Sequence, residues 1–285
     1  MPTNPDSVHS VLITGASSGI GRTCALHMDR LGWRVFAGVR RQQDGDSLRA
    51  DASPRLLPVV LDVTRPQQIR HAVEVVERIV GAAGLTGLVN NAGIAYGGPI
   101  EFLDLERIRQ AFDVNFFGII AVTQAFIPLL RTAGGRLVNV SSISGLIAAP
   151  FLSPYTTSKF ALEALSDALR VELSPWQIRV VVVEPGAVRT PIWDKSARLA
   201  ESVVASLPSR GVALYHEALE TFQAGLVPHG IPVEAVARAV ARALTSPRPA
   251  TRYRTGLDGF LVGILRSLPD SLRDRFFLSR YPRWG

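Results

Sequence analysis

Cysteine and lysine are both scarce in this chain of 285 residues. Cys24 is the single cysteine, which excludes an intramolecular disulfide framework, and no histidines accompany it at the spacing of zinc ligands. We therefore expect no metal site and a reducing, cytoplasmic location. Only two of the 31 basic residues are lysines, Lys159 and Lys195, and the other 29 are arginines. A lysine is thus an unusual choice at any position of this chain.

Long hydrophobic runs are also missing. Residues 1–10 show no basic stretch followed by an apolar segment, so we expect no secretory signal. The most apolar window, residues 116–130, contains Thr123, Gln124 and Pro128, and we interpret it as a buried helix. With 47% hydrophobic and 19% charged residues, the chain is too apolar for disorder, and its length fits one large domain. The composition favours a globular protein with a sizeable core.

Acidic residues do not balance the arginines, and the formal net charge is +7. The basic residues are mixed with acids along the chain, without the pattern of a nucleic-acid binder, so we expect no nucleic-acid partner. The tail from Arg248 onward is the exception, because its eight arginines and three acids give it +5 of the total. Residues 259–278 of this tail are amphipathic, with an interruption at Pro269. The tail either closes a binding site, contacts an anionic membrane peripherally, or packs on the protein's own surface.

Short runs rich in valine, isoleucine and leucine alternate with longer segments of helical periodicity. Strands are predicted at residues 8–14, 34–39, 56–61, 87–90, 135–141 and 178–184. Helices are predicted at residues 19–31, 66–82, 105–131 and 155–173, with Thr64 as the cap of the second. This alternation predicts a doubly wound α/β fold with a parallel sheet and helices on both faces. A ligand should then bind at the carboxyl ends of the strands.

Glycine and small residues follow the first predicted strand, in the sequence Thr-Gly-Ala-Ser-Ser-Gly-Ile-Gly at residues 14–21. Glycine permits a tight turn and lets the backbone approach a pyrophosphate, which then lies at the N-terminus of the next helix. The spacing of Gly15, Gly19 and Gly21 differs from the G-x-G-x-x-G fingerprint, and an ordinary strand-to-helix turn would also use glycines. The position after the first strand favours a phosphate site.

Charged and amide residues follow the next three strands. Arg40 and Arg41 come after the second strand, where a dinucleotide site places an acid for the ribose hydroxyls or an arginine for a 2′-phosphate. No acid lies between that strand and residue 44, so these arginines favour NADP(H), although two solvated loop cations are the alternative. Asp62 and Val63 follow the third strand, where the carboxylate either contacts an adenine amino group or caps a helix. Residues 90–93, Asn-Asn-Ala-Gly, let the backbone pass close to a ligand after the fourth strand.

A tyrosine and a lysine lie one helical turn apart after the fifth strand. Tyr155 and Lys159 open a predicted helix at i and i+4, so their side chains share one face. An ammonium about 4–6 Å from a phenol favours the phenolate and lowers the phenol pKa from about 10, which suits a general acid or base. This spacing alone is common in helices without such a role. The scarcity of lysine and the presence of Ser142 thirteen residues before the tyrosine favour a catalytic group.

These motifs, together with Pro185 and Gly186 after the sixth strand, resemble the short-chain dehydrogenase/reductase (SDR) family over roughly residues 8–245. The resemblance implies a single-domain, Rossmann-type enzyme that transfers hydride between a nicotinamide and a carbinol or carbonyl carbon. It implies that Tyr155 is the proton donor or acceptor and that Lys159 lowers its pKa and holds the nicotinamide ribose. It further implies that Ser142 hydrogen-bonds the substrate oxygen.

The resemblance also assigns the remaining site residues. Asn115 would support a water that links Lys159 to bulk solvent. The implied cofactor contacts are Gly15, Ser17, Ser18, Gly19, Ile20 and Gly21 for the pyrophosphate; Arg40 for a 2′-phosphate; Asp62 and Val63 for adenine; Asn90, Asn91, Ala92 and Gly93 for adenosine and ribose; Tyr155 and Lys159; and Pro185, Gly186, Val188 and Thr190 for the carboxamide and phosphates.

The loop between Ser142 and Tyr155 contains no charged residue and predicts an apolar wall for the substrate, although a loop packed on the core is the alternative. Candidate substrate contacts are Ser142, Ile143, Leu146, Phe151 and Trp193. Within the single domain of residues 1–285, we expect a dinucleotide-binding and catalytic core at 8–190, a helical substrate lid at 191–228 and a helical C-terminal extension at 251–285.

A looser resemblance to the steroid and retinol dehydrogenase branch favours a steroid-like, retinoid-like or other lipid-like secondary alcohol or ketone. The first hypothesis is an NADP(H)-dependent oxidoreductase for such a substrate. An NAD-dependent lipid-alcohol dehydrogenase is the second, and a non-catalytic nucleotide sensor is a third. The resemblance also implies a homodimer or homotetramer that pairs through the helices at 105–131 and 155–173.

Overall fold

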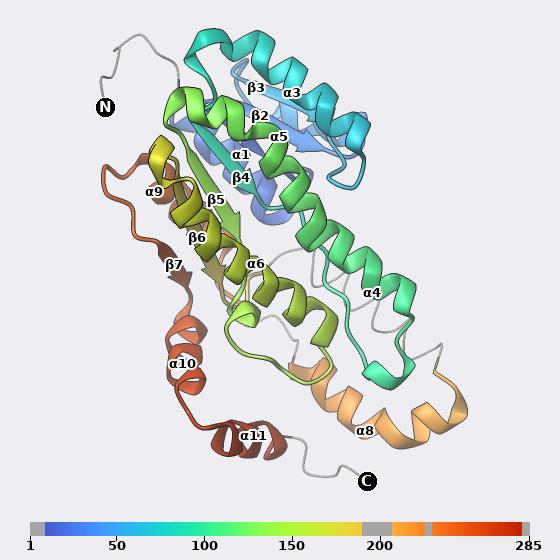
Figure 1. The fold of residues 1–285 in the computed structure, drawn as a ribbon. Coiled ribbons are helices and arrows are strands. Elements are labelled where there is room, and N and C mark those ends of the chain that lie inside the picture. Colours follow the sequence, from blue (N-terminus) through green and yellow to red (C-terminus); the bar gives the residue numbers. More distant parts are fainter. Residues whose placement is uncertain (1–8, 190–206, 226–229, 281–285) are drawn as a thin grey trace.

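The computed structural model describes residues 9–189, 207–225 and 230–280, and its centre is one parallel sheet of seven strands in the order β3-β2-β1-β4-β5-β6-β7 (Figure 1). The strands are β1 (Ser10–Ile13), β2 (Arg34–Val39), β3 (Leu56–Val60), β4 (Gly87–Asn90), β5 (Arg136–Val140), β6 (Arg179–Pro185) and β7 (Arg252–Thr255). The order reverses between β1 and β4, which places a crevice for a ligand at the carboxyl ends of these strands.

Helices cover both faces of the sheet. They are α1 (Gly19–Arg30), α2 (Gln42–Ala50), α3 (Pro66–Val80), α4 (Leu105–Phe112), α5 (Gly118–Ala133), α6 (Ser153–Glu172), α8 (Ser209–Gly225), α9 (Val233–Thr245), α10 (Leu257–Arg266) and α11 (Asp270–Leu278). On one face, Met28 of α1 and Val240 of α9 share a buried cluster with β1, β2 and β5. On the other, Val76 of α3 and Phe126 of α5 pack with Leu88 of β4. Two apolar layers therefore fix the sheet from both sides, as in the predicted doubly wound fold.

The predicted strands and helices are all present, with ends shifted by one or two residues, but three elements were not predicted. Strand β7 and helices α2 and α9 are additions. The prediction that Thr64 caps α3 is wrong, because the helix begins at Pro66 with Arg65 at the cap position and no capping side chain. The hydroxyl of Thr64 instead donates to the Asp62 carboxylate at 2.7 Å.

The longest helical segment combines α4, a π-helical turn at Asp113–Phe117 and α5. This run, Leu105–Ala133, has 29 residues and a mean hydropathy of 1.6 over its most apolar window, and it is the one helix among the described residues long and apolar enough to cross a membrane. In the structure Val122, Phe126 and Leu130 are buried against the sheet. This is the packing expected of the buried helix predicted at residues 116–130.

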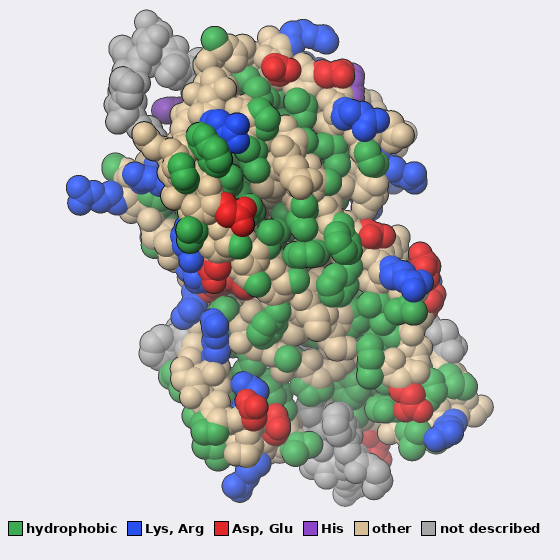
Figure 2. Space-filling model, viewed as in Figure 1, with side chains coloured by type: hydrophobic (Ala, Val, Ile, Leu, Met, Phe, Trp, Pro, Cys, Tyr) green, Lys and Arg blue, Asp and Glu red, His purple; other side chains and the backbone are tan. Residues whose placement is uncertain are grey.

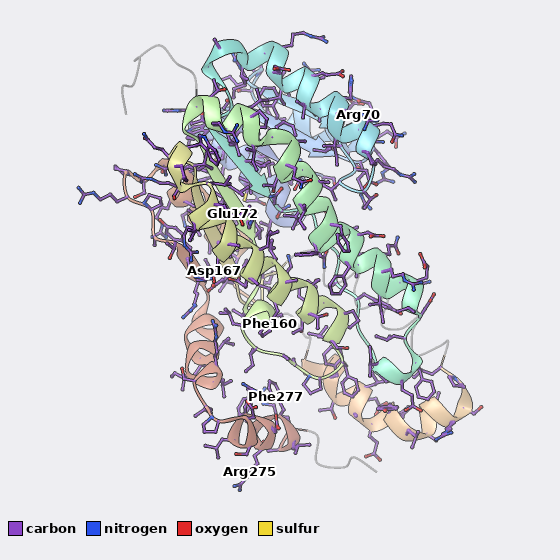
Figure 3. The ribbon with its side chains drawn as sticks, viewed as in Figure 1. Arg70, Phe160, Asp167, Glu172, Arg275 and Phe277 are labelled. Atoms are coloured by element: carbon purple, nitrogen blue, oxygen red, sulfur yellow. The ribbon has the colours of Figure 1, made fainter. Side chains whose placement is uncertain are left out.

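The C-terminal extension folds back onto the loop that follows Ser142. Val262 and Leu265 of α10 and Phe277 of α11 share a cluster with Leu146 and other residues of that loop. Phe277 lies on the side of α11 that faces this loop (Figure 3). The basic tail therefore packs on the protein's own surface, which is one of the three interpretations. It does so close to the segment that precedes Tyr155.

Candidate active site

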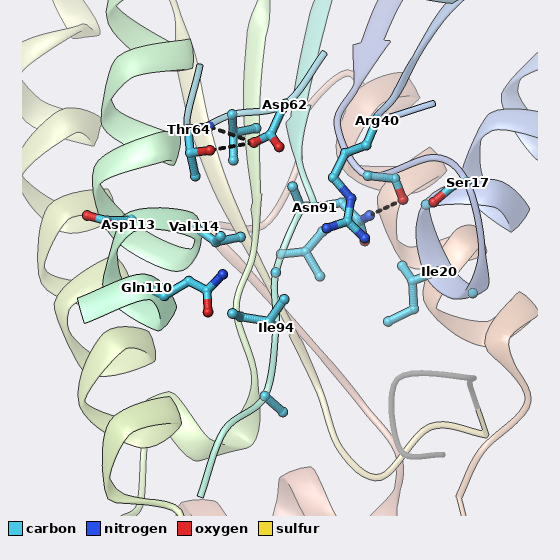
Figure 4. A pocket seen from close by; sticks show the side chains of 18 of the residues that line it. Ser17, Ile20, Arg40, Asp62, Thr64, Asn91, Ile94, Gln110, Asp113 and Val114 are labelled. Atoms are coloured by element: carbon cyan, nitrogen blue, oxygen red, sulfur yellow. Dashed lines mark hydrogen bonds between the residues drawn. The ribbon is translucent and has the colours of Figure 1, made fainter. Parts of the chain in front are cut away.

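A cavity of about 690 Å³ opens at the carboxyl ends of the strands, where the predicted site residues converge (Figure 4). Loops after β1, β2, β3, β4 and β5 form its walls, and the start of α6 closes one end. The predicted residues in its lining are Gly15, Ser17, Ser18, Gly19, Ile20, Gly21, Arg40, Asp62, Val63, Asn91, Ala92, Gly93, Tyr155 and Lys159. One cavity thus brings together the predicted catalytic pair and most of the predicted cofactor contacts.

The glycine loop after β1 is packed too closely to accept side chains. Gly15 has φ +67°, and a Cβ atom there would lie 2.8 Å from the Cα of Ala92. The Asn91 side chain crosses behind the loop and donates from Nδ2 to the carbonyl oxygen of Thr14 at 2.9 Å. The first turn of α1 begins within this loop, and its free N–H groups carry the partial positive charge of the helix. A pyrophosphate fits this glycine-lined cradle, so the site suits a dinucleotide.

The two arginines after β2 have different environments. Arg41 forms an ion pair with Asp44, with Nη2 of the arginine 3.1 Å from Oδ1 of the aspartate. The side chain of Arg40 reaches over the cavity beside Asn91 and Ser17 (Figure 4). Arg40 has no carboxylate partner among the residues that the structure describes. Its charge is therefore available to an anionic group of a ligand.

Asp62 occupies the adenine end of the predicted site and also stabilises its own turn. Its Oδ1 atom accepts hydrogen bonds from the backbone N–H of Thr64 at 2.9 Å and from the Thr64 hydroxyl. Asp62 makes these bonds and also lines the cavity, together with Val63. The sequence left a choice between a ligand contact and a helix cap. The structure shows a turn-stabilising carboxylate that faces the cavity, and not a helix cap.

The Tyr155 and Lys159 side chains meet at the inner end of the cavity. The Lys159 ammonium lies 5.8 Å from the centre of the Tyr155 ring and donates to the carbonyl oxygen of Val140 at 2.9 Å. Burial lowers the pKa of Lys159 to about 8, and the negative charge of Glu163 partly opposes this shift. At neutral pH the ammonium form therefore predominates.

The expected lowering of the Tyr155 pKa is not found. Burial raises the pKa of Tyr155 above its ordinary value, and a hydrogen bond with Ser142 only partly offsets that effect. The prediction considered the nearby ammonium alone and left out the loss of water around the phenol. Desolvation is the largest influence on the pKa of the phenol in this structure, where the ammonium of Lys159 donates to the Val140 carbonyl.

Asn115 lies in the π-helical turn and is completely buried. It is not one of the described residues that line the cavity. Its Oδ1 accepts from the N–H of Ile94 at 2.9 Å, and its Nδ2 donates to the Ile94 carbonyl at 2.9 Å and to Ser158 Oγ at 3.0 Å. Gly93 lies between Asn115 and Lys159, since a Cβ on this glycine would be 3.4 Å from Asn115 Oδ1 and 3.9 Å from Lys159 Nζ. The contacts show a fixed asparagine near the lysine, and its link to a water stays a prediction.

Other predicted cofactor residues lie outside the described cavity lining. The Asn90 amide is turned into the protein, where Nδ2 donates to Thr123 Oγ1 and Asn139 Oδ1 at 2.9 Å each. Pro185, Gly186 and Val188 follow β6, where the Gly186 N–H donates to the Thr255 carbonyl and Val188 is buried. Thr190 and Trp193 lie outside the described residues.

The candidate substrate contacts are divided between two apolar clusters. Ile143 and Leu146 pack with the C-terminal extension, as described above. Phe151 is buried against α8, with its ring 6.2 Å from Tyr215 and 5.7 Å from Phe222. Ser142 is buried beside Tyr155 and accepts a hydrogen bond from the N–H of Ser144. The loop thus packs within the protein, as in the alternative interpretation, and its contact with substrate stays a prediction.

Sequence reasoning missed the cavity residues from α4 and the π-helical turn. Glu106, Arg107, Gln110, Asp113 and Val114 also line the cavity. In Figure 4, Gln110, Asp113 and Val114 lie across from Ser17 and Ile20 of the glycine loop. Their helix was predicted, but the face that it turns to the cavity depends on how α4 packs against α6. A helical pattern alone carries no such information.

Comparison with known proteins decides the family. The model of the short chain dehydrogenase family matches residues 9–200, which include the glycine loop, Ser142, Tyr155 and Lys159. The chain belongs to this family. It is therefore an NAD(P)-dependent oxidoreductase that acts on a CH–OH group and interconverts a hydroxyl and a carbonyl group.

Curated relatives of this SDR enzyme cover nearly its whole length. It is 39% identical to 17-beta-hydroxysteroid dehydrogenase type 6 of Bos taurus over 282 residues, which span 96% of this chain and 89% of the relative. It is 39% identical to retinol dehydrogenase 5 of Homo sapiens, over 95% of this chain and 88% of that protein. The mitochondrial D-beta-hydroxybutyrate dehydrogenase of Bos taurus is 34% identical, over 96% and 85% of the two chains. The first two confirm the resemblance to the steroid and retinol dehydrogenase branch.

Solved structures of the family have the same fold. A short-chain dehydrogenase from Streptomyces avermitilis superimposes with a TM-score of 0.77 at 29% identity and covers 98% of this chain and 99% of its own. A short-chain dehydrogenase from Burkholderia cenocepacia in complex with NADP gives a TM-score of 0.73 at 26% identity, over 95% and 98% of the two chains. A Burkholderia phymatum SDR in complex with NAD gives 0.77 at 23% identity, over 91% and 92%, and supports the fold alone.

Proposed function

We propose that this SDR enzyme uses NADP(H) and interconverts a hydrophobic secondary alcohol and the corresponding ketone. The observation that carries the choice of cofactor is Arg40, which lines the cavity with no carboxylate partner among the described residues, while Arg41 is neutralised by Asp44. A 2′-phosphate would supply the missing anion. The NADP complex of the Burkholderia cenocepacia relative is consistent with this choice.

The chain's own residues supply the proton chemistry. Tyr155 faces the cavity, and its phenol protonates the forming alkoxide during reduction and takes the proton back during oxidation. Ser142 hydrogen-bonds to the phenol and to the substrate oxygen, which stabilises the developing negative charge. Lys159 carries a positive charge beside this pair and would hold the ribose of a bound nicotinamide cofactor. A bound nicotinamide supplies or accepts the hydride.

A hydrophobic substrate is supported by the surroundings of the catalytic end. Tyr215 and Phe222 of α8 form an aromatic cluster with Phe102 and Phe151, and the 143–147 loop carries no charge. The names of two relatives refer to a hydroxysteroid and to retinol, whereas a third refers to a small hydroxy acid. We propose Ser142, Ile143, Leu146 and Phe151, with Trp193, as the residues that select a lipid-like substrate.

Cofactor preference is tested without a guess about the substrate. We expect NADPH to bind more tightly than NADH, as measured by quenching of tryptophan emission and enhancement of nicotinamide fluorescence. Arg40→Asp removes a cation and adds an anion beside the 2′-phosphate, so NADPH affinity should fall by about 10²-fold or more, corresponding to about 3 kcal/mol, while NADH affinity changes little. Arg41→Asp is the matched control, because Arg41 already pairs with Asp44.

The outcomes of this titration separate the hypotheses. Preference for NADH, with no effect of Arg40→Asp, would contradict the NADP(H) assignment and favour oxidation of a lipid alcohol by an NAD-dependent enzyme. Preference for NADPH leads to assays with lipophilic ketones in the reducing direction, followed at the nicotinamide absorbance. Binding of the cofactor without turnover of any ketone or alcohol would favour the nucleotide sensor.

A homodimer or homotetramer is proposed through the face formed by α5 and α6. Phe117, the last residue of the π-helical turn before α5, is 57% exposed and Phe160 of α6 is 41% exposed, and apolar side chains gather over these helices in Figure 2. Phe160 points outward from α6 (Figure 3). Exposed aromatic rings are enriched at protein interfaces.

Light scattering at micromolar concentration should give at least twice the mass of 30.8 kDa. Phe160→Glu should shift the protein toward the monomer, and a monomeric wild type would contradict the proposal.

Membrane contact is proposed for the outer side of the C-terminal extension. Leu261 and Ile264 of α10 are 58% and 50% exposed, on the side opposite to Val262. Arg266 lies nearby along the chain and would meet anionic head groups. In this arrangement the enzyme is cytoplasmic and peripheral to the membrane.

A further inference from the structure

A buried carboxylate lies one helical turn beyond the catalytic lysine. Glu163 follows Lys159 at i+4 on α6 and is 7% exposed. The Ser141 hydroxyl lies beside it and lowers the pKa of this carboxyl. Ser141 also follows Val140, whose carbonyl accepts the hydrogen bond from Lys159. Glu163 and Lys159 are therefore linked through the same end of β5.

Strand β7 brings one arginine to this carboxylate and a second arginine to a neighbouring buried carboxylate. Arg252 Nη2 lies 3.2 Å from Glu163 Oε2 and 2.7 Å from Asp167 Oδ1, while its Nε lies 3.0 Å from Oε1 of Glu184. Arg254 Nε lies 2.7 Å from the other oxygen of Glu184. Glu184 is fully buried in β6. Arg252 thus joins two buried carboxylates from α6 and β6.

The charges around Glu163 act in opposite directions. Burial and the negative charge of Glu184 raise the pKa of the Glu163 carboxyl, whereas Arg252 and Ser141 lower it. Without the arginine, a carboxyl in this position would favour its neutral form. Burial is the largest of these influences and leaves the pKa of Glu163 above its ordinary value, while the ion pair with Arg252 favours the anion one turn from the buried ammonium.

Within the part of the chain that the structure describes, few other titratable groups face Lys159. Tyr155 precedes it on α6, and Glu106, Arg107 and Asp113 line the cavity from α4 and the π-helical turn. The end of β5 contributes the Val140 carbonyl, the two serines that follow the strand contribute hydroxyls, and Asn115 is uncharged. Among the described residues, Glu163 is the charged group that favours the ammonium form of Lys159.

We infer that Glu163, held in its ionised form by Arg252 of β7, is a positioning residue that keeps Lys159 protonated during the reaction. This inference rests on the proposed function only in that Lys159 serves Tyr155 in catalysis. Strand β7 and the buried ion pairs behind it would then control the charge state of the catalytic centre. Glu163 itself touches neither substrate nor cofactor in this arrangement.

The scarcity of lysine allows a direct test that needs no substrate. Protein labelled with ¹³C-lysine gives signals from Lys159 and Lys195 only, and Lys195→Arg leaves the first alone. The ¹³Cε shift reports protonation of the amine, and the midpoint for wild-type Lys159 should lie at about 8. Glu163→Gln keeps the shape of the side chain and removes its charge. It should lower the midpoint by about one pH unit, a tenfold change in the ratio of charged to neutral lysine.

Asp167→Asn is the matched control. Asp167 also pairs with Arg252, but it is one turn further along α6, on the side facing β7, and partly exposed (Figure 3). This control should leave the Lys159 midpoint in place, and Glu163→Asp should restore most of the wild-type value. A merely structural role for Glu163 would lower the Tm of the Gln variant without moving the midpoint.

Two results would overturn the inference. One is an unchanged Lys159 midpoint in Glu163→Gln, and the other is an equal shift in Asp167→Asn. Where turnover with NADPH and a ketone is measurable, the alkaline limb of the pH profile of kcat should shift downward with the midpoint. If no substrate turns over, the proposed function fails, yet the lysine titration still decides whether Glu163 controls Lys159.

Discussion

Replacing Tyr155 with phenylalanine should lower kcat by about 10²–10⁴-fold while the dissociation constant of the cofactor changes little. The phenol lines the cavity and is hydrogen-bonded to Ser142, and in the proposed mechanism it is the group that exchanges a proton with the substrate oxygen. The ring itself fills space that phenylalanine also fills, so the cavity should keep its shape. Steady-state turnover and a fluorescence titration with NADPH on the same preparation measure the two effects.

Tyr253→Phe is the control for this experiment. The Tyr253 hydroxyl also forms a hydrogen bond, accepting from the N–H of Ala250 at 3.2 Å, but it lies on β7 outside the cavity lining. Its loss should leave kcat near the wild-type value. Retained activity in Tyr155→Phe would contradict the mechanism, and a large loss of cofactor affinity would show that the phenol mainly binds the nucleotide.

The strands at the centre of the sheet could be predicted because nearly all of their side chains serve only to fill the apolar core. Strands β1, β2 and β4 carry little except apolar side chains packed on both faces, and their ends agree closely with the sequence pattern. The glycine loop and the Tyr155–Lys159 pair were predictable for a related reason, because each depends on local spacing along the chain. The backbone geometry of the strand ends then brings them to one cavity.

Strand β7 was missed because it does not look like a buried strand. Its sequence, Arg-Tyr-Arg-Thr, has two charges, which are usual for a solvated loop. The charges are tolerated since Arg252 and Arg254 meet the buried Glu184 of the neighbouring strand. Such a pairing joins residues about 70 positions apart in the sequence, and no periodicity predicts it.

The pKa of Tyr155 shows a second limit of sequence reasoning. Spacing correctly placed an ammonium near the phenol, but it could not show that Lys159 would donate to Val140 or how much water the phenol would lose. Both depend on the tertiary packing of α6 against β5 and the 143–147 loop. Electrostatic effects of burial therefore had to come from the structure.

Substituting alanine for Gly21 should reduce cofactor affinity by about 10- to 100-fold, because the phosphate cradle cannot keep its shape. A Cβ atom at this position would overlap the carbonyl oxygen of Gly15 and the Nδ2 atom of Asn91. Asn91 fixes the loop through its bond to Thr14, so the clash should displace the N–H groups that we assign to a pyrophosphate. Loss of one charged hydrogen bond to a phosphate costs about 1.5–3 kcal/mol, which gives the expected range.

Gly263→Ala serves as the comparison for this variant, since it also lies in a helix. Its nearest neighbour is the guanidinium of Arg254 at 3.2 Å, the far end of a flexible side chain. Alanine favours helix over glycine by about 1 kcal/mol, so helix propensity itself should not destabilise either variant. Titration with NADPH should therefore separate them, with Gly263→Ala close to wild type. Equal affinities in Gly21→Ala and the wild type would mean that the pyrophosphate lies elsewhere in the cavity, and the assignment of the glycine loop would be wrong.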